Sequence, residues 1–291
     1  MIPASFDYHA PNTIEEAISL LKQHGDEAKI LAGGHSLLPM MKLRFASPEH
    51  IVDINNVEGL AYIKEENGQL KLGAMTRESE LEDFELVTAK FPIFTDANKL
   101  IADPQVRNLG TIGGNLAHGD AANDHPAVML ALRASIEITG SNGKRTVPID
   151  EFFFGFYSTA IQADEILTEI SIPIPGAGTG SVYHKLERKV GDYATAGVAV
   201  QLTIDGSNTC QEIGIGLTNV NPVPLRATRS EEVLKGQVIT DELVEQAAQF
   251  ASEDCSPSED LRGDEEYKRA MIGVLTKRMI KRAMERAQSN L

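Results

Sequence analysis

Residues 1–56 alternate between helical and strand-like spacing of apolar positions. Thr13 followed by Glu16 predicts a capping box, after which apolar residues recur at helical spacing. Apolar runs at 29–32 and 50–54 predict two short strands. A Gly-Gly turn and a short helical turn lie between these strands, so the order predicts a small α/β subdomain.

From residue 60 onward, apolar and polar residues alternate with the period of a strand. Two Asn-Gly pairs, at 67–68 and 142–143, lie inside such stretches and predict β-hairpins, because both residues tolerate the positive φ values of tight hairpin turns. The same part of the chain is predicted to contain a helix over 84–101 that Pro92 interrupts, a helix over 123–133 and a strand over 165–172.

The glycine-rich stretch I-P-G-A-G-T-G-S, at 174–181, is the best candidate for a linker. The last predicted helix places its apolar residues on one face and most of its basic residues elsewhere. This pattern favours a helix that packs on a sheet, with a basic docking surface for a partner subunit as the alternative. The pattern beyond the linker predicts three strands and then three helices, at 182–187, 196–204, 212–217, 227–235, 240–252 and 264–287.

Charge and composition exclude several classes of function. A formal net charge of −15 disfavours nucleic-acid binding, because most of the surface repels phosphate. We expect no membrane span and no secretory signal, since no long apolar run exists and the N-terminus lacks a leader pattern. Cys210 and Cys255 form no C-x-x-C motif and cannot supply a disulfide framework, a zinc site or an iron–sulfur cluster. A reducing cytoplasm is the predicted compartment.

Two Gly-Gly pairs are the strongest candidates for a binding site: Gly33-Gly34 and Gly113-Gly114. Glycine lets a ligand approach the backbone, and successive amides in such a turn form a nest for an anion. Neither loop matches the P-loop or the G-x-G-x-x-G pattern. The predicted chemistry is therefore binding of an internal pyrophosphate by backbone amides, and a purely structural turn is the alternative for each loop. A bulky side chain at Gly33 or Gly114 is expected to abolish binding and to leave folding largely intact.

Specific motifs resemble a known family. A-G-G-H-S-L-L-P-M-M-K-L-R at 32–44 and T-I-G-G-N-L-A-H-G-D-A-A-N-D-H-P-A at 111–127 are similar to the two flavin-binding segments of the FAD-binding medium subunits of aerobic carbon monoxide dehydrogenase-type molybdenum hydroxylases, in the xanthine oxidase family. G-A-M-T at 73–76 and K-L-E-R-K-V-G-D-Y-A at 185–194 match in the same order. The resemblance spans nearly the whole chain, which makes it more specific than either loop alone.

The resemblance implies an α+β fold. It consists of a two-part FAD-binding domain of the vanillyl-alcohol-oxidase (PCMH) type, followed by a smaller C-terminal domain with a three-stranded antiparallel sheet and helices. The expected boundaries are 1–56 and 57–176 for the two FAD-binding subdomains, and 177–291 for the C-terminal domain.

The resemblance also implies which residues bind FAD. The first loop would hold the pyrophosphate through the backbone amides of Ala32, Gly33, Gly34, His35, Ser36 and Leu37. The second loop would close on the same phosphates and on the ribityl chain through Thr111, Ile112, Gly113, Gly114 and Asn115.

Five further residues are expected at the cofactor by resemblance. Asp124 would accept hydrogen bonds from FAD hydroxyls, although a carboxylate at a helix start also has a purely local explanation. Ile101 and Ile161 would make apolar contacts, and an ordinary core position is the alternative for both. Lys185 would place a cation beside the flavin, and Tyr193 would lie against its ring. No catalytic residue and no metal site are expected.

The implied function is electron transfer within a heteromeric complex. A large subunit with a molybdenum–pterin cofactor would oxidise the substrate, and a small subunit with two [2Fe–2S] clusters would pass electrons to FAD on this chain. A dimer of such heterotrimers is expected. A quinone, cytochrome, oxygen or NAD would accept the electrons, and attachment to the inner face of the membrane through this acceptor is an alternative to a purely cytoplasmic location.

Three alternatives remain open at this point. The chain could serve a xanthine, aldehyde or N-heterocycle dehydrogenase instead of a carbon monoxide dehydrogenase. It could be a free-standing flavin oxidoreductase with its own substrate pocket. It could also be a non-enzymatic binding protein with a vestigial site.

Overall fold

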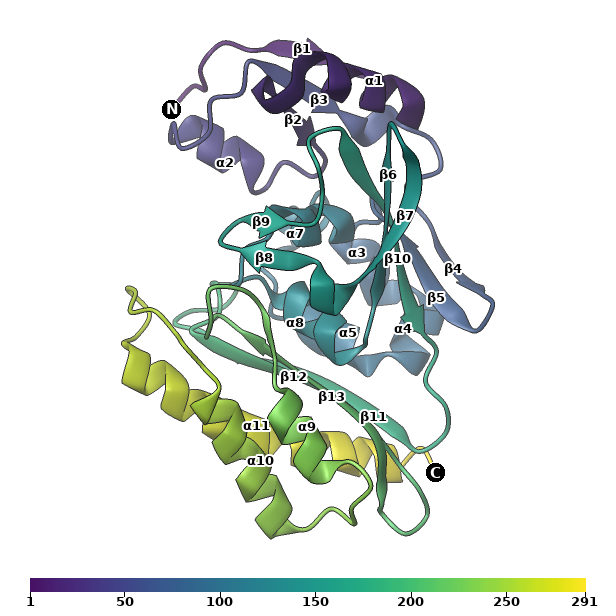
Figure 1. Cartoon of the computed structure of the whole chain (residues 1–291), viewed down its shortest axis with the longest axis vertical. Coiled ribbons are helices and arrows are strands. Elements are labelled where there is room, and N and C mark those ends of the chain that lie inside the picture. Colours follow the sequence, from purple (N-terminus) through teal and green to yellow (C-terminus); the bar gives the residue numbers. More distant parts are fainter.

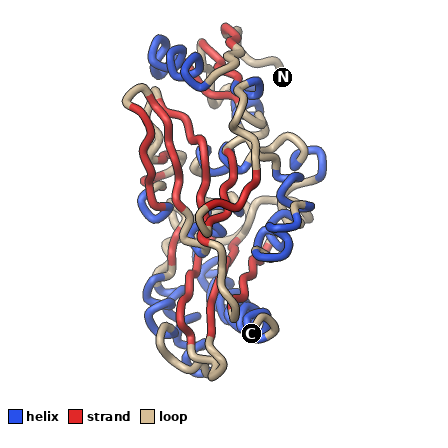
Figure 2. Tube along the Cα trace, turned by 90° about the vertical axis from the view of Figure 1, so that its right-hand side faces the viewer, coloured by secondary structure: helices blue, strands red, loops and turns tan.

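Three of the four sheets follow one another along the long axis of the computed structural model, which describes residues 1–291 (Figure 1), and the fourth is a two-stranded hairpin. Seen from the side in Figure 2, the strands of these sheets succeed one another from the N-terminal end to the C-terminal end. No helix combines the length and apolar character needed to cross a membrane.

The N-terminal sheet is small and parallel, in the order β1-β3-β2. Thr13 caps the first helix as predicted, because its side chain accepts from the Glu16 N–H at 3.2 Å. The predicted reciprocal bond of the capping box forms one residue earlier than expected. The Glu16 carboxylate accepts from the N–H of Asn12 instead of that of Thr13. The elements are β1 (Asp7–His9), α1 (Ile14–His24), β2 (Ala28–Leu31), α2 (Leu37–Lys42) and β3 (His50–Asp53), with short 3₁₀ turns at Gly25–Glu27 and Ile54–Asn56.

The middle sheet is antiparallel, in the order β4-β5-β10-β6-β7. Both hairpins predicted from Asn-Gly pairs exist, and Asn67 and Gly68 have the positive φ values of 53° and 72° that such a turn requires. The second turn is displaced by one residue, because Gly143 already begins a strand. The strands are β4 (Ile63–Glu66), β5 (Gln69–Gly73), β6 (Ser135–Gly140), β7 (Gly143–Pro148) and β10 (Glu165–Pro173).

Short helices cover the middle sheet. The predicted helix over 84–101 is interrupted at Pro92, as expected, because proline lacks the N–H that would continue it. The helix predicted from 123 begins at Asp124. The remaining elements of this part are α3 (Glu78–Asp83), α4 (Glu85–Lys90), α5 (Pro92–Asn98), α6 (Pro104–Arg107), α7 (Ile112–His118), α8 (Asp124–Ala131), a 3₁₀ turn (Ile149–Glu151) and the hairpin of β8 (Phe153–Gly155) and β9 (Ser158–Thr159).

The C-terminal sheet is antiparallel and has the order β11-β12-β13-β14. The expected count of three strands is wrong, because a fourth strand of two residues, Leu225–Arg226, pairs with β13. The predicted linker is also too long, since strand structure resumes at Thr179. The elements are β11 (Thr179–Leu186), β12 (Ala196–Ile204), β13 (Cys210–Thr218), β14 (Leu225–Arg226), α9 (Thr228–Leu234), α10 (Asp241–Glu253) and α11 (Glu265–Gln288).

Helix α11 packs on β11 and β12, which confirms the favoured interpretation of its pattern. Its apolar face, formed by Ile272, Leu275, Met279 and Ala283, is buried in the C-terminal core. Helix α8 of the middle part packs against β13, so the C-terminal sheet has helices on both faces.

Candidate functional site

A cavity of about 810 Å³ lies where the three parts of the chain meet. Its lining comes from both Gly-Gly loops, the start of α8, the end of β11, the loop after β11 and the segment around β9. One predicted site residue is absent from this lining: Ile112 is fully buried in the middle core instead. The predicted residues that do line the cavity are Ala32, Gly33, Gly34, His35, Ser36, Leu37, Ile101, Thr111, Gly113, Gly114, Asn115, Asp124, Ile161, Lys185 and Tyr193.

The first loop carries a run of unused backbone donors. The N–H groups of residues 32–37 donate to no group of the chain. Gly34 has a φ of +78°, a conformation that glycine adopts at little cost. All six residues line the cavity, and all but His35 are partly buried. Because buried amides are nearly always bonded, this run of free donors indicates a site for an anionic or strongly accepting group.

The second loop is built differently. The N–H groups of Ile112, Gly113 and Asn115 donate to the carbonyls of Thr76, Ala74 and Thr111. The Gly114 N–H donates to the Thr111 hydroxyl at 3.1 Å. The free donors and acceptors of this loop are therefore the Thr111 N–H and the side chain of Asn115, whose Oδ1 is buried without a partner. The sequence suggested two equivalent anion nests. In the structure only the first loop has a run of free amides.

The glycines bring protein segments together. A Cβ on Gly33 would lie 2.3 Å from the carbonyl oxygen of Leu109, and a Cβ on Gly113 would lie 2.6 Å from that of Ala74. A Cβ on Gly114 would lie 2.6 Å from the Thr111 hydroxyl. Contrary to the expectation from the sequence, side chains at Gly33 or Gly114 are therefore predicted to perturb the fold as well, because they would first collide with the chain itself.

Two residues that the sequence did not single out brace the loops. The Arg77 guanidinium donates to the carbonyl of Leu109 and, at 2.6 Å, to Oδ1 of Asn55. The Asn55 amide nitrogen in turn donates to the carbonyl of Ala32 at 2.9 Å. Arg77 and Asn55 thus connect the end of β2 to the segment before the second loop. These contacts join residues far apart in sequence, so no local pattern predicts them.

A buried charged group lies at one wall of the cavity. Lys185 Nζ, on β11, donates to Asp124 Oδ2 at 2.9 Å, and the Tyr183 hydroxyl donates to the other oxygen of Asp124. Asp124 and Lys185 are only 6% and 3% exposed. Burial raises the pKa of Asp124, although Lys185 acts in the opposite direction. Glu187 lies 3.7 Å from Lys185, so the lysine charge is matched within the chain.

Aromatic residues line the open side of the cavity. Tyr193 is 43% exposed, and the Arg262 guanidinium lies 5.5 Å from the centre of its ring. His118 and Tyr157 have ring centres 4.8 Å apart. Burial lowers the pKa of His118, whereas burial and Asp120 raise the pKa of Tyr157 to about 12. Neither residue carries a charge at neutral pH, so this side of the cavity suits a flat, largely apolar ring.

Two protein-family models match the chain and together cover most of its length. The family described as "FAD binding domain in molybdopterin dehydrogenase" matches residues 4–175. The family described as "CO dehydrogenase flavoprotein C-terminal domain" matches residues 181–283. The chain belongs to this flavoprotein family. The resemblance of its motifs is thereby confirmed, and the chain is a FAD-binding oxidoreductase subunit.

Two relatives align with almost the whole chain. The carbon monoxide dehydrogenase medium chain of Hydrogenophaga pseudoflava is 51% identical over 98% of this chain and 99% of its own length. The carbon monoxide dehydrogenase medium chain of Afipia carboxidovorans is 46% identical over 99% of this chain and 100% of its own length. A solved structure of the Hydrogenophaga pseudoflava enzyme, which lacks the Mo-pyranopterin moiety, superposes with a TM-score of 0.96 at 52% identity, covering 98% and 99% of the two chains. This likeness confirms the two-domain α+β fold.

Proposed function

We propose that the chain is the electron-transfer subunit of a carbon monoxide dehydrogenase-like molybdenum hydroxylase, and that its FAD lies in the cavity between the three parts. The observation that carries this proposal is the run of free amides at residues 32–37, which faces a cavity of about 810 Å³. Full-length identity to carbon monoxide dehydrogenase medium chains supports the choice among the molybdenum hydroxylases.

The residues of the cavity fit a dinucleotide. The free amides of the first loop would neutralise the pyrophosphate, and the unpartnered Oδ1 of Asn115 would accept from a sugar or ribityl hydroxyl. The apolar side chains of Ile101 and Ile161 would cover ring surfaces and exclude water. Tyr193, on the loop after β11, would lie along the exposed face of the ring system.

Asp124 and Lys185 have a positioning role in this proposal. Asp124 accepts from Tyr183 and Lys185 and still faces the cavity, so its carboxylate would also accept from a cofactor hydroxyl. The Lys185 ammonium favours the ionised form of that carboxylate and so opposes the burial, which raises the pKa of Asp124. FAD, when bound, supplies the ability to take up electrons in pairs and to release them singly.

The proposed partners follow from the small number of cysteines in this chain. Its two cysteines are both buried, so the chain does not offer the four thiolates of a ferredoxin-type [2Fe–2S] cluster. We propose that a small iron–sulfur subunit delivers electrons from a large molybdenum subunit, and that an external acceptor removes them from FAD. A dimer of heterotrimers is the proposed assembly, with a cytoplasmic location.

Reconstitution of the purified chain tests the function. The apo chain is expected to bind one FAD, to show reducible flavin absorbance, and to bind FMN far more weakly, because FMN has no pyrophosphate bridge. A chain that takes up neither flavin would contradict the proposal.

A turnover assay separates the proposal from a free-standing oxidoreductase. Carbon monoxide oxidation with an artificial acceptor is expected for the complex isolated with its partner subunits, and not for the FAD-loaded chain alone. Turnover of carbon monoxide or of an aldehyde by the isolated chain would favour the free-standing enzyme. Turnover of a purine by the complex, but not of carbon monoxide, would favour a xanthine dehydrogenase-type complex.

A further inference from the structure

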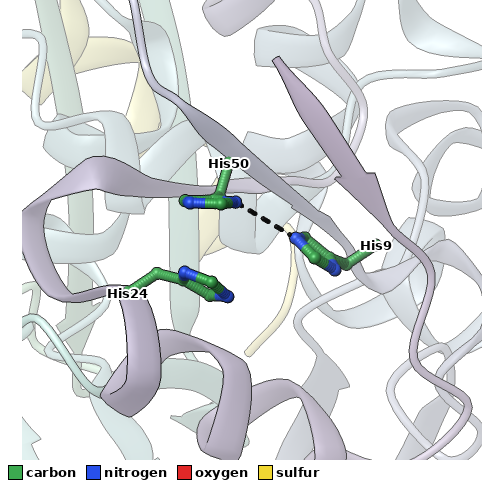
Figure 3. A group of neighbouring side chains, drawn as sticks. All are labelled: His9, His24 and His50. Atoms are coloured by element: carbon green, nitrogen blue, oxygen red, sulfur yellow. Dashed lines mark hydrogen bonds between the residues drawn. The ribbon is translucent and has the colours of Figure 1, made fainter.

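Three histidines distant in sequence converge on one face of the N-terminal sheet (Figure 3). His9 ends β1, His24 ends α1 and His50 begins β3. They are three of the seven histidines in the chain, and none of them lines the flavin cavity. No local sequence pattern relates the three histidines, because their spacings match no metal-binding motif.

The imidazole nitrogens lie close enough to share one ion. His9 Nε2 and His50 Nδ1 are 3.2 Å apart, and a ligand nitrogen from each of the three rings lies within 4.8 Å of the others. Zinc–nitrogen bonds of about 2.0–2.1 Å in a tetrahedron place the ligand nitrogens roughly 3.4 Å apart. The pair formed by His9 and His50 already has this separation, and rotation of the His24 side chain brings the third nitrogen closer.

His24 is the least satisfied member of the cluster. Its Nε2 is buried and has no hydrogen-bond partner. Its ring lies against that of His50, with centres 3.6 Å apart. A neutral imidazole keeps a lone pair on one ring nitrogen, so an unpartnered ring nitrogen at this position suits a metal ligand.

Acidic residues lie next to His50. The Asp7 carboxylate lies 3.8 Å from His50 Nδ1, and the carboxylates of Glu27 and Glu49 lie within 4.8 Å of His50 and of each other. Imidazoles next to carboxylates form a set of ligands that suits a divalent cation. A carboxylate or a water is also available for the fourth position.

We propose that His9, His24 and His50 form a binding site for a divalent transition-metal ion such as Zn²⁺ or Co²⁺. Metal binding displaces the proton shared by His9 and His50, which moves to the other ring nitrogen or to solvent. The ion ties β1, the end of α1 and the start of β3 to one point. It therefore stabilises a sheet that has only three strands and whose first strand has three residues.

Metal titration of the untagged, FAD-loaded full chain tests this site. Co²⁺ is expected to bind once per chain with the visible absorbance of a four-coordinate ion, and Zn²⁺ is expected to displace it and to raise the Tm. His9→Gln and His24→Gln are each expected to weaken Co²⁺ binding at least about tenfold. His184→Gln, which changes an exposed histidine of β11, is the matched control and should bind Co²⁺ like the unmodified chain.

Each other outcome contradicts the proposal. It fails if the unmodified chain binds no Co²⁺, or if His24→Gln binds Co²⁺ as well as the control. It also fails if the double variant Glu27→Gln, Glu49→Gln loses binding while His9→Gln keeps it, because the ion would then occupy the neighbouring carboxylate cluster. Should a histidine variant not fold, protection of the three histidines from diethyl pyrocarbonate by Zn²⁺ in the unmodified chain decides the question.

Discussion

The six free N–H groups of residues 32–37 give the sharpest residue-level prediction. In the apo chain these amides have no acceptor in the protein and should exchange quickly with solvent. Bound FAD should slow their hydrogen–deuterium exchange at least about tenfold. Residues 112–115, whose amides are already bonded within the chain, should change much less. Equal protection of both segments would mean that the loops contribute amides equally.

Gly33 is predicted to matter for folding as well as for the flavin. In Gly33→Ala the new Cβ would lie 2.3 Å from the Leu109 carbonyl oxygen, which forces the two loops apart. We expect a loss of about 1–3 kcal/mol in the free energy of unfolding, together with reduced FAD occupancy. Gly206→Ala is the control, because nothing lies within 4 Å of its Cβ. Denaturant unfolding and flavin content measure the two effects, and an unchanged Gly33→Ala protein would refute this packing argument.

At the scale of elements, an ion pair connects β7 and β10 across the strand between them. Arg145 donates to both oxygens of Glu165 at 2.8 and 2.7 Å, and Gly140 on β6 leaves room for the Glu165 side chain to cross. The hydrogen bonds from Arg145 hold the pKa of Glu165 below its ordinary value of 4.5. Glu165→Gln should therefore cost about 1 kcal/mol at neutral pH, a value reduced for the partial exposure of Arg145.

The pH dependence of this pair has a definite sign. Because the folded-state pKa of Glu165 is lowered, its contribution is complete above pH 4.5 and disappears as the pH falls through the folded-state value. The difference in unfolding free energy between the unmodified chain and Glu165→Gln should therefore be constant from pH 7 to 5 and shrink in more acidic solution. A difference that grows on acidification would contradict this assignment.

Elements with strong local signals were predictable. Pro92 ended a helix where proline must, and the first Gly-Gly pair lies, as predicted, in the turn between a strand and a short helix. The two-residue strand β14 carries too few residues for a periodic signal. Long-range contacts were also invisible: nothing local relates Arg77 to Leu109, or Glu78 to the buried His125 with which it pairs. The resemblance predicted most of the residues that line the cavity. It did not predict that only the first loop offers a run of free amides.

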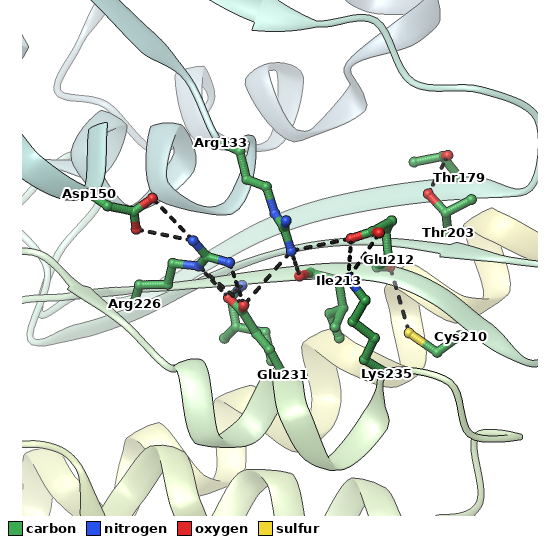
Figure 4. Close-up of polar contacts among 11 residues, drawn as sticks. Arg133, Asp150, Thr179, Thr203, Cys210, Glu212, Ile213, Arg226, Glu231 and Lys235 are labelled. Atoms are coloured by element: carbon green, nitrogen blue, oxygen red, sulfur yellow. Dashed lines mark hydrogen bonds and ion pairs between the residues drawn. The ribbon is translucent and has the colours of Figure 1, made fainter. Parts of the chain in front are cut away.

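At the scale of the molecule, the flavin-binding half and the C-terminal half share an interface that reaches the cavity. Arg226 of β14 pairs with Asp150 of the middle part, and Arg133, after α8, donates to the carbonyl of Ile213 on β13 (Figure 4). Tyr183 and Ala199 of the C-terminal sheet belong to the middle core. The cavity also needs both halves, because Asp124 lies on α8 and Lys185 on β11. We therefore expect flavin release and loss of secondary structure to coincide in one unfolding transition.

Gly216 provides the test of this coupling, since α8 lies so close to β13 that a Cβ on Gly216 would be 2.0 Å from the Ala127 carbonyl oxygen. Gly216→Ala should push α8 away and move Asp124 relative to Lys185. We expect the free energy of unfolding to fall by about 2–3 kcal/mol and FAD affinity to fall with it. Gly176→Ala, in the open connection before β11, should leave both unchanged. If Gly216→Ala destabilises the fold but binds FAD normally, the interface does not set the geometry of the cavity, and the two halves contribute to FAD binding independently.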